Sequence, residues 1–159
     1  MNIYIMSKYT LWGTATWYLF HTLAEKIKPQ EFHKLKNELI MLIKNICSGL
    51  PCPDCALHSS QILAGYKSYH LLQSKDDFKR FVFEFHNIVN NKAKNEVFNK
   101  DILEKYKTGN LSKIFQYWYQ TFSVKGSLSN TLMINSINRD NIRVNVQKFF
   151  QTNQNSFEL

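Results

Sequence analysis

The chain has few cysteines, few arginines and no long hydrophobic run, and each shortage excludes a class of protein. Three cysteines among 159 residues cannot form the paired disulfide framework of a small secreted domain. A chain of this length can bury a hydrophobic core without such cross-links, so its cysteines are available for chemistry. An aromatic content of 14% and a hydrophobic content of 44% exclude a disordered chain.

The sequence also lacks a segment that would carry it into a membrane. The longest uncharged stretch near its start covers residues 9–24 and contains several polar side chains. This stretch is shorter than the roughly 20 apolar residues that a membrane-spanning helix needs. No basic segment precedes it and no small-residue cleavage site follows it, so we expect no signal peptide and no membrane span.

Arginine is scarce, although the chain is basic. Twenty basic residues against twelve acidic residues give a net charge of +8. Only three of the basic residues are arginines, namely Arg80, Arg139 and Arg143, whereas nucleic-acid readers use arginine forks and clustered basic stripes. Lysines scattered singly along helical faces are typical of a solvated surface. We therefore expect no nucleic-acid partner.

Apolar residues at helical spacing predict an all-α fold. Pro29 ends the first predicted helix, and Pro53 is tolerated in the first turn of another. Short connections between four amphipathic helices favour a four-helix bundle over a parallel sheet. The expected helices are residues 10–28, 32–48, 53 onward and 74–89, with a shorter fifth helix at residues 99–107.

Beyond Gly109 the pattern changes. We expect residues 1–110 to form the helical domain and residues 111–159 to form a C-terminal extension whose structure the pattern does not define. The aromatic stretch at residues 114–122 predicts one more helix, and a polar Asn/Ser-rich tail follows it. Within this tail, the alternation of residues 142–146 (IRVNV) predicts a strand.

The sharpest chemical feature is the motif CPDC at residues 52–55, at a predicted helix start. Two cysteines at this spacing can close a small, readily reduced disulfide, and the free N–H groups of the first helical turn lower the pKa of the first thiol. The alternative is a non-catalytic interaction module held by zinc, in which Cys47 and His58 join Cys52 and Cys55 as ligands. A lone Cys47 is otherwise typical of buried packing.

Two clusters of ring and amide side chains flank this motif. The first, which we call the tryptophan cluster, consists of Trp12, Gly13, Trp17 and His21. On a helix, Trp17 and His21 lie one turn apart, and Gly13 lies one turn earlier on the same side. A bare backbone beside two rings leaves a slot in which a flat ring could lie. The alternative is ordinary core packing.

The second cluster, which we call the histidine–asparagine cluster, follows in a later helix. Buried asparagines in an amphipathic helix cost free energy unless something polar is bound there. A heteroaromatic ligand with hydrogen-bonding edges meets this need, and the lysines would neutralise a pyrophosphate. The alternative is a solvated polar face. The members of the cluster are His86, Asn87, Val89, Asn90, Lys92 and Lys94.

Together, the motifs W-G-x3-W-x3-H, C-x-x-C and H-N-x-V-N resemble, in this order, the Erv/ALR family of FAD-linked sulfhydryl oxidases over about residues 8–98. The short chain and its Lys/Asn-rich composition resemble the branch encoded by large cytoplasmic DNA viruses. The resemblance implies a four-helix bundle that binds FAD in its mouth, usually as a homodimer. For a viral protein it implies the host cytoplasm, and the virion as well.

The resemblance also implies roles for individual residues. Cys55 would be the thiol next to the flavin, Cys52 would exchange with the substrate, and the two clusters would bind FAD. Electrons would pass from a thiol-containing protein or a small redox carrier through the cysteine pair to FAD, and then to molecular oxygen, giving hydrogen peroxide. The chain departs from the family at Ala93, where leucine is usual, and at residues 95–96, where Asn-Glu replaces Lys-Pro.

Overall fold

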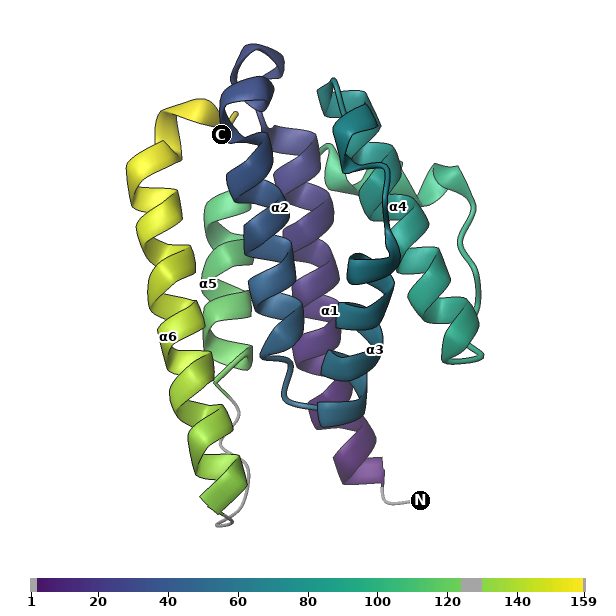
Figure 1. The fold of residues 1–159 in the computed structure, drawn as a ribbon, viewed down its shortest axis with the longest axis vertical. Helices are drawn as coiled ribbons and strands as arrows, with labels where there is room; N and C mark the ends of the chain where they lie inside the picture. Colours follow the sequence, from purple (N-terminus) through teal and green to yellow (C-terminus); the bar gives the residue numbers. More distant parts are fainter. Residues whose placement is uncertain (1–2, 124–129, 159) are drawn as a thin grey trace.

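The structure is an all-α bundle, as the helical periodicity predicts. The computed structural model describes residues 3–123 and 130–158, and these form helices without a strand. The α-helices are α1 (Ile3–Lys26), α2 (Phe32–Ser48), α3 (Pro53–Gly65), α4 (Lys75–Lys92), α5 (Leu111–Thr121) and α6 (Asn130–Asn153) (Figure 1). Short 3-10 helices join them: η1 (Pro29–Glu31), η2 (Tyr69–Leu71), η3 (Lys100–Tyr106) and η4 (Gln154–Ser156).

Helix α1 makes the most extensive contacts in the bundle. It packs against α4, α5 and η3, while α2 packs against α3 and α6, and α3 packs against α4. In Figure 1 the helices run roughly along the long axis, with α6 at one edge, α1 and α2 near the middle, and α4 towards the other edge. Helices α5 and α6 therefore extend the predicted four-helix bundle on the side away from α4. In the described ranges, no helix has the length and apolarity that crossing a membrane requires.

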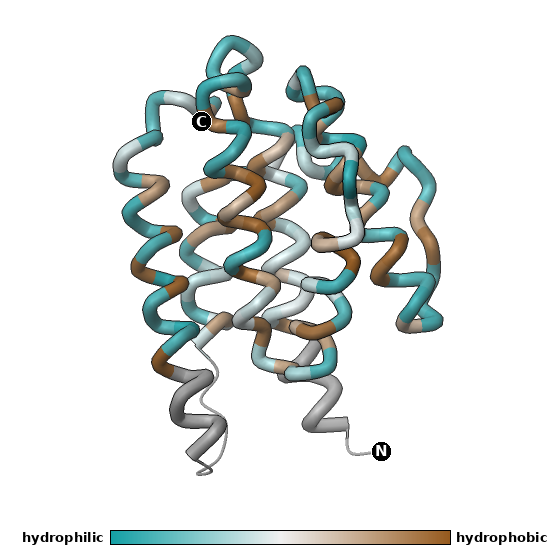
Figure 2. The backbone as a smooth tube through the Cα atoms, in the orientation of Figure 1, coloured by the Kyte–Doolittle hydropathy of each residue, from teal (hydrophilic) through white to brown (hydrophobic). Residues whose placement is uncertain are grey.

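One hydrophobic core includes side chains from all six α-helices. Apolar positions recur along each helix with hydrophilic positions between them (Figure 2), so each helix turns one face inward. Trp118 of α5 and the adjacent Phe122 are both 0% exposed. Burying each such side chain contributes about 1.5–3 kcal/mol. The aromatic helix predicted for residues 114–122 is thus part of the same core as α1–α4.

Helix α4 begins with a capping box. The side-chain oxygen of Ser74 accepts the backbone N–H of Asp77 at 3.1 Å, and the Asp77 carboxylate accepts the backbone N–H of Ser74 at 3.1 Å. Two N–H groups that would otherwise lack a partner at the helix start are satisfied in this way. The helix start predicted at residues 74–77 is therefore confirmed.

The strand predicted for residues 142–146 is wrong, because this segment lies in the middle of α6. The same segment also fits a helical pattern, since the apolar residues Ile142, Val146 and Phe149 are spaced four and three positions apart. All three belong to the hydrophobic core or pack against it. Packing against the rest of the bundle therefore decides that residues 142–146 form a helix and not a strand. Residues 124–129 of the predicted polar tail lie outside the described residues.

The segment after α6 returns to the end of α1. The backbone N–H of Lys28 donates to the carbonyl of Ser156 at 2.9 Å, and the N–H of Glu158 donates to the carbonyl of Lys26 at 2.7 Å. Between these two hydrogen bonds, Ile27 and Phe157 form an isolated β-bridge. The far end of α6 is thereby attached to the connection between α1 and α2.

The capping box generates a stability prediction. We expect Ser74→Ala to lower the free energy of unfolding by about 1 kcal/mol, because the Asp77 N–H loses its acceptor. Urea denaturation followed by circular dichroism measures the change. Ser68→Ala is the matched control, since Ser68 precedes η2 without a side-chain capping hydrogen bond. Equal losses in the two variants would contradict the capping role of Ser74.

Candidate functional site

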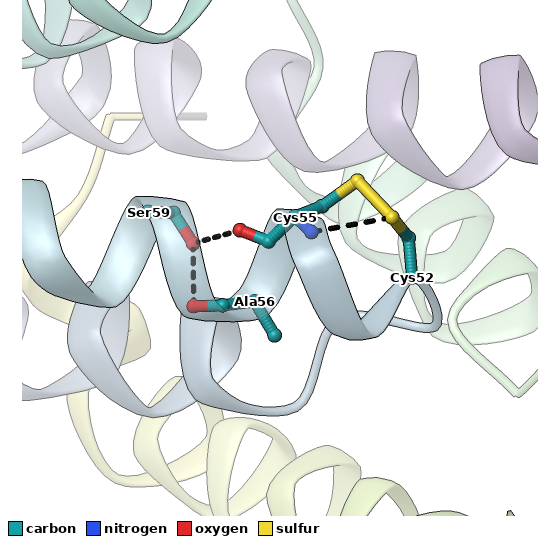
Figure 3. The surroundings of a disulfide bond; sticks show 4 residues. All are labelled: Cys52, Cys55, Ala56 and Ser59. Carbon is teal, nitrogen blue, oxygen red and sulfur yellow. Dashed lines mark hydrogen bonds between the residues drawn. A yellow bond between two sulfur atoms is a disulfide. The ribbon is translucent and has the colours of Figure 1, made fainter.

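Cys52 and Cys55 form a disulfide at the first turn of α3, as their spacing predicts. Their Cα atoms are 5.2 Å apart. Cys52 is the N-cap residue of α3, and its sulfur accepts the backbone N–H of Cys55 at 3.2 Å (Figure 3). A sulfur in this place lies at the positive end of the helix dipole, which stabilises a thiolate when the disulfide is reduced.

Ser59 supports the turn that carries Cys55. Its hydroxyl donates to the carbonyl of Cys55 at 2.7 Å and lies 3.2 Å from the carbonyl of Ala56 (Figure 3). The Ser59 hydroxyl also lowers the pKa of the Cys47 thiol at the end of α2, so Ser59 lies between these two parts of the bundle.

The third cysteine is buried inside the bundle. Cys47 is 2% exposed, and burial raises the pKa of its thiol to about 12, although the hydrogen bond with Ser59 opposes the shift. At neutral pH this thiol stays protonated, and a protonated thiol is a poor nucleophile. Its burial agrees with the prediction that Cys47 packs in the core.

A cavity of about 350 Å³ lies next to the disulfide. Residues from α1, α3 and α4 and from the end of α2 line it, and Cys55 belongs to this lining while Cys52 does not. The two cysteines of the motif are thus inequivalent, because only one of them faces the cavity. The predicted cofactor residues that line the cavity are Trp12, Gly13, Trp17, Val89, Asn90 and Lys92.

Gly13 leaves an open space in the wall of this cavity. A Cβ atom added to it would meet no protein atom within 4 Å. Glycine within a helix lowers the stability of the helix by roughly 1 kcal/mol relative to alanine. At this position no neighbouring side chain is close enough to exclude a Cβ. The bare backbone fits a flat ligand that lies against α1. Together with the ring faces of Trp12 and Trp17, this space fits the ring system of a flavin.

His21 and His86 form a buried pair behind Trp17. Nε2 of His21 lies 3.0 Å from Nδ1 of His86. The Trp17 ring stacks on His86 with a centroid distance of 3.9 Å, and the Tyr106 ring stacks on His21 at 4.4 Å. Neither histidine lines the cavity. The histidine pair instead holds Trp17, whose side chain does line the cavity.

Both imidazoles are neutral at neutral pH. Burial lowers the pKa of His21 to about 3, with further contributions from His86 and Lys105. Burial also lowers the pKa of His86 to about 4, and Lys105 adds to that shift. A neutral pair can share one hydrogen bond, with one nitrogen donating and the other accepting.

The asparagines of the second cluster bond to the protein's own backbone. The amide of Asn87 donates to the carbonyl of Phe98 and accepts the N–H of Phe98, both at 2.9 Å. The amide of Asn90 donates to the carbonyl of Glu96 at 3.0 Å. The segment after α4 thus supplies polar partners for the Asn87 amide and for one N–H of Asn90, so Asn87 needs no ligand to be satisfied, and ligand binding by Asn90 stays a prediction. Asn90 still lines the cavity, whereas Asn87 does not.

The two lysines of this cluster differ in position. Lys92 lines the cavity, and Lys94 does not. Lys94 adopts a φ of 58° in the turn after α4, where the backbone N–H of Asn95 donates to the carbonyl of Asn90 at 2.8 Å. Lys92 is therefore the better placed of the two for a negative group in the cavity.

Sequence reasoning missed two aromatic residues around the histidine pair. Tyr106 ends η3 and is 3% exposed, and the ring of Phe98 meets His86 edge-on at 5.2 Å. Neither residue belongs to a helical repeat that would identify a buried face. Only the contacts with α1 and α4 reveal their role.

The structure does not favour the alternative of a zinc site, because two of its four expected ligands are not free thiols. Cys52 and Cys55 are joined to each other, and a disulfide sulfur is not the thiolate that binds zinc. Among the residues that the structure describes, no group of three or more His, Cys, Asp or Glu side chains is placed to hold a metal ion. Of the four expected ligands, the cavity lining contains Cys47, Cys55 and His58 but lacks Cys52.

Known proteins resemble this chain over its helical bundle. A FAD-linked sulfhydryl oxidase of African swine fever virus is 33% identical over 86 residues, which cover 54% of this chain and 71% of that protein. The corresponding protein of a second isolate is 31% identical over 86 residues. The FAD-linked sulfhydryl oxidase ERV1 of Arabidopsis thaliana is 30% identical over 78 residues, which cover 49% of this chain and 40% of the plant protein. No solved structure matches the chain significantly.

The family match covers most of the described structure. It extends over residues 14–125, from the middle of α1 to beyond α5. It includes the disulfide, the histidine pair and Ser59, and it leaves Trp12, Gly13 and α6 outside. The resemblance predicted from the three motifs is confirmed, and the chain belongs to the Erv1/Alr family.

Proposed function

We propose that this protein is a FAD-linked sulfhydryl oxidase that forms disulfide bonds in its substrates. The observation that carries the proposal is the disulfide at the start of α3, whose Cys55 lines a cavity with an open wall at Gly13. The relatives from African swine fever virus and Arabidopsis thaliana, which are named FAD-linked sulfhydryl oxidases, support the same activity.

The two cysteines take different parts in thiol exchange. A substrate thiolate attacks Sγ of Cys52, the S–S bond breaks, and Cys55 leaves as a thiolate. A second substrate thiol then displaces Cys52 from the mixed disulfide, so the substrate leaves oxidised and the pair is left reduced. Two facts favour this assignment. Cys52 lies outside the cavity lining, and its sulfur accepts the N–H of Cys55, which stabilises a thiolate there.

The cavity residues would bind and orient the cofactor. Bound FAD would supply a two-electron acceptor that restores the disulfide and passes the electrons to molecular oxygen, with hydrogen peroxide as the product. Trp12 and Trp17 offer ring faces, and Gly13 leaves space along α1. Lys92 supplies a positive charge in the lining, and we assign the phosphate contact to it in place of the missing Lys-Pro and of Lys94.

Three residues of the two clusters, His21, His86 and Asn87, act from behind the cavity. His21 and His86 hold the Trp17 ring by stacking and by their shared hydrogen bond. Asn87 attaches the segment after α4 through its two hydrogen bonds with Phe98. We therefore assign these three residues to positioning the cavity wall.

The electron donor we propose is a thiol-containing protein or a small redox carrier. The 159 residues contain one Cys-x-x-Cys pair and one further cysteine, so within them no second pair could relay electrons to Cys52. A homodimer is also proposed, on the strength of the family resemblance.

Replacing the cavity-facing cysteine tests the assigned chemistry. We expect Cys55→Ser to lower oxygen consumption with dithiothreitol to the background rate, because Cys52 then has no partner for a disulfide. An oxygen electrode measures the rate, and the visible spectrum should still show bound flavin. A colourless wild-type protein with stoichiometric zinc would contradict the proposal. Cys47→Ala tests the third cysteine separately and should retain most of the activity, because the redox disulfide remains.

A side chain at the open wall tests cofactor binding. Gly13→Leu should weaken FAD binding by at least about tenfold, since a side chain there fills space that we assign to the ligand. Without FAD its free energy of unfolding should stay the same or rise by up to about 1 kcal/mol. Gly65→Leu is the matched control, because a Cβ at Gly65 also meets nothing within 4 Å but lies outside the cavity lining. Equal FAD affinity in both variants would contradict the assigned site.

The neutral histidine pair predicts a pH dependence of stability. Because the folded pKa values are about 3 and about 4, below the ordinary value of 6.5, the unfolded chain binds more protons between these limits. The histidine contribution is therefore complete above pH 6.5 and is lost as the pH falls towards 4. Urea denaturation of FAD-free protein at several pH values should show this fall, with at most about 1.4 kcal/mol per pH unit from each histidine.

His86→Gln removes one member of the pair and should flatten this dependence. His70→Gln is the control, because His70 is exposed and belongs to no buried pair. A His86→Gln variant that keeps the full slope of the wild type would show that other groups cause the acid destabilisation.

A further inference from the structure

Helix α6 reaches the chain segment that leads into the redox disulfide. Gly49 follows the last residue of α2 and precedes Cys52 by three positions. A Cβ atom on Gly49 would collide with Cδ1 of Ile142, and it would lie 3.6 Å from Cζ of Phe122 and 3.7 Å from Cγ of Arg139. Side chains from the end of α5 and from α6 thus close around this one residue.

The backbone conformation of Gly49 does not itself require glycine. Its φ of −107° and ψ of 12° are open to other residues, whereas a glycine that ends a helix usually has a positive φ. No glycine in the described part of the chain has a positive φ. The absence of a Cβ at this position instead lets the end of the Ile142 side chain pack directly against the backbone, and a Cβ there would displace it.

A shift of Gly49 would reach the cavity. The N–H of Gly49 donates to the carbonyl of Ile46 at 3.1 Å, and the N–H of Leu50 lies 3.4 Å from the carbonyl of Cys47. Leu50 packs against the hydrophobic core and lines the cavity together with Cys55. The position of Gly49 is consequently coupled to the cavity wall through its immediate neighbour.

Helix α6 is itself held firmly enough to act on Gly49. Nε of Arg143 donates to the carbonyl of Tyr119 at 2.8 Å, and the guanidinium lies 3.9 Å from the centre of the Tyr119 ring. Val146 is 3% exposed within the core. Beyond α6, the hydrogen bond from Lys28 to Ser156 attaches the segment to the end of α1. The contact of Ile142 is therefore made from a helix with anchors on α5, in the core and beside α1.

We propose that α6, through the contact of Ile142 with Gly49, positions the segment of residues 49–55 that carries the redox disulfide. Ile142 is a positioning residue, since it acts on the cysteines through the backbone of Gly49. The family match ends at residue 125, so this device belongs to a helix outside the matched region. Its relevance to catalysis rests on the proposed oxidase function, but the contact itself does not.

Reduction of the disulfide in FAD-free protein tests the proposal. Dithiothreitol is added without oxygen, and the freed thiols are alkylated and counted by mass spectrometry. We expect Ile142→Ala to speed reduction by about threefold or more, because the segment around Cys52 becomes freer to meet the attacking thiolate. Val144→Ala is the matched control on the same helix, since Val144 is 42% exposed. Equal rates in the wild type and Ile142→Ala would overturn the proposal.

Hydrogen exchange separates positioning from a general loss of stability. In Ile142→Ala, amides of residues 46–56 should exchange about tenfold faster than in the wild type, while those of α4 should keep their rates. A uniform increase over all helices would mean that Ile142 is only a packing residue, and would overturn the proposal.

Exchanging the sizes of the side chains at positions 49 and 142 gives a second, independent test. Gly49→Ala places a methyl group where Ile142 now lies and should also speed disulfide reduction. The double variant Gly49→Ala/Ile142→Ala makes room for this methyl group and should return the rate to within about twofold of the wild type. A double variant that is faster than both single variants would overturn the proposal. If Gly49→Ala does not fold, the comparison of Ile142→Ala with Val144→Ala decides alone.

These measurements do not depend on oxidase activity. A wild-type protein that binds FAD but consumes no oxygen with dithiothreitol would refute the proposed function. The rates of disulfide reduction and hydrogen exchange would still decide whether α6 positions the segment. The two failures are therefore distinguishable.

Discussion

The hydrogen bond between His21 and His86 joins α1 to α4, the two helices that supply most of the predicted cofactor residues. It needs at least one unprotonated nitrogen as acceptor, and burial lowers the pKa of both rings so that both are neutral at neutral pH. Trp17 stacks on one ring and Tyr106 on the other. The spacing of the two helices, and with it the wall of the cavity, depends on this pair. Protonation of both rings would leave two donors facing each other and break this hydrogen bond.

The redox pair combines two environments at one helix turn. Cys52 caps α3, where the helix dipole favours a negative sulfur, while Cys55 lines the cavity. The third cysteine is separated from this chemistry by its protonation state, because burial raises the pKa of Cys47 to about 12. In the proposed mechanism, this single turn presents one sulfur to a thiol substrate and the other to the cofactor, and the hydrogen bond from Ser59 to the Cys55 carbonyl supports the turn.

Much of the fold follows from local sequence signals, and the site follows less completely. The capping box at Ser74 and the apolar repeats predicted α2 and α4, because these signals act within a few residues. The prediction of a strand at residues 142–146 was wrong, since α6 is packed against the distant helices α2 and α5. In the site, the motif at residues 52–55 predicted the disulfide. The bonds of Asn87 to Phe98 could not be predicted, because they join residues with no common repeat.

The pairing of residues 26–28 with residues 156–158 bears on the order in which the bundle assembles. Lys28 and Asn155, which also bond through the lysine side chain, are 127 positions apart. Joining such distant segments in an unfolded chain carries a large loop-closure entropy, which falls once the intervening helices have folded. We therefore expect this pairing to form after the helices between its two segments have folded. During synthesis, the helices up to α5 emerge before residues 156–158, so the disulfide turn can fold before its neighbour α6 is secured.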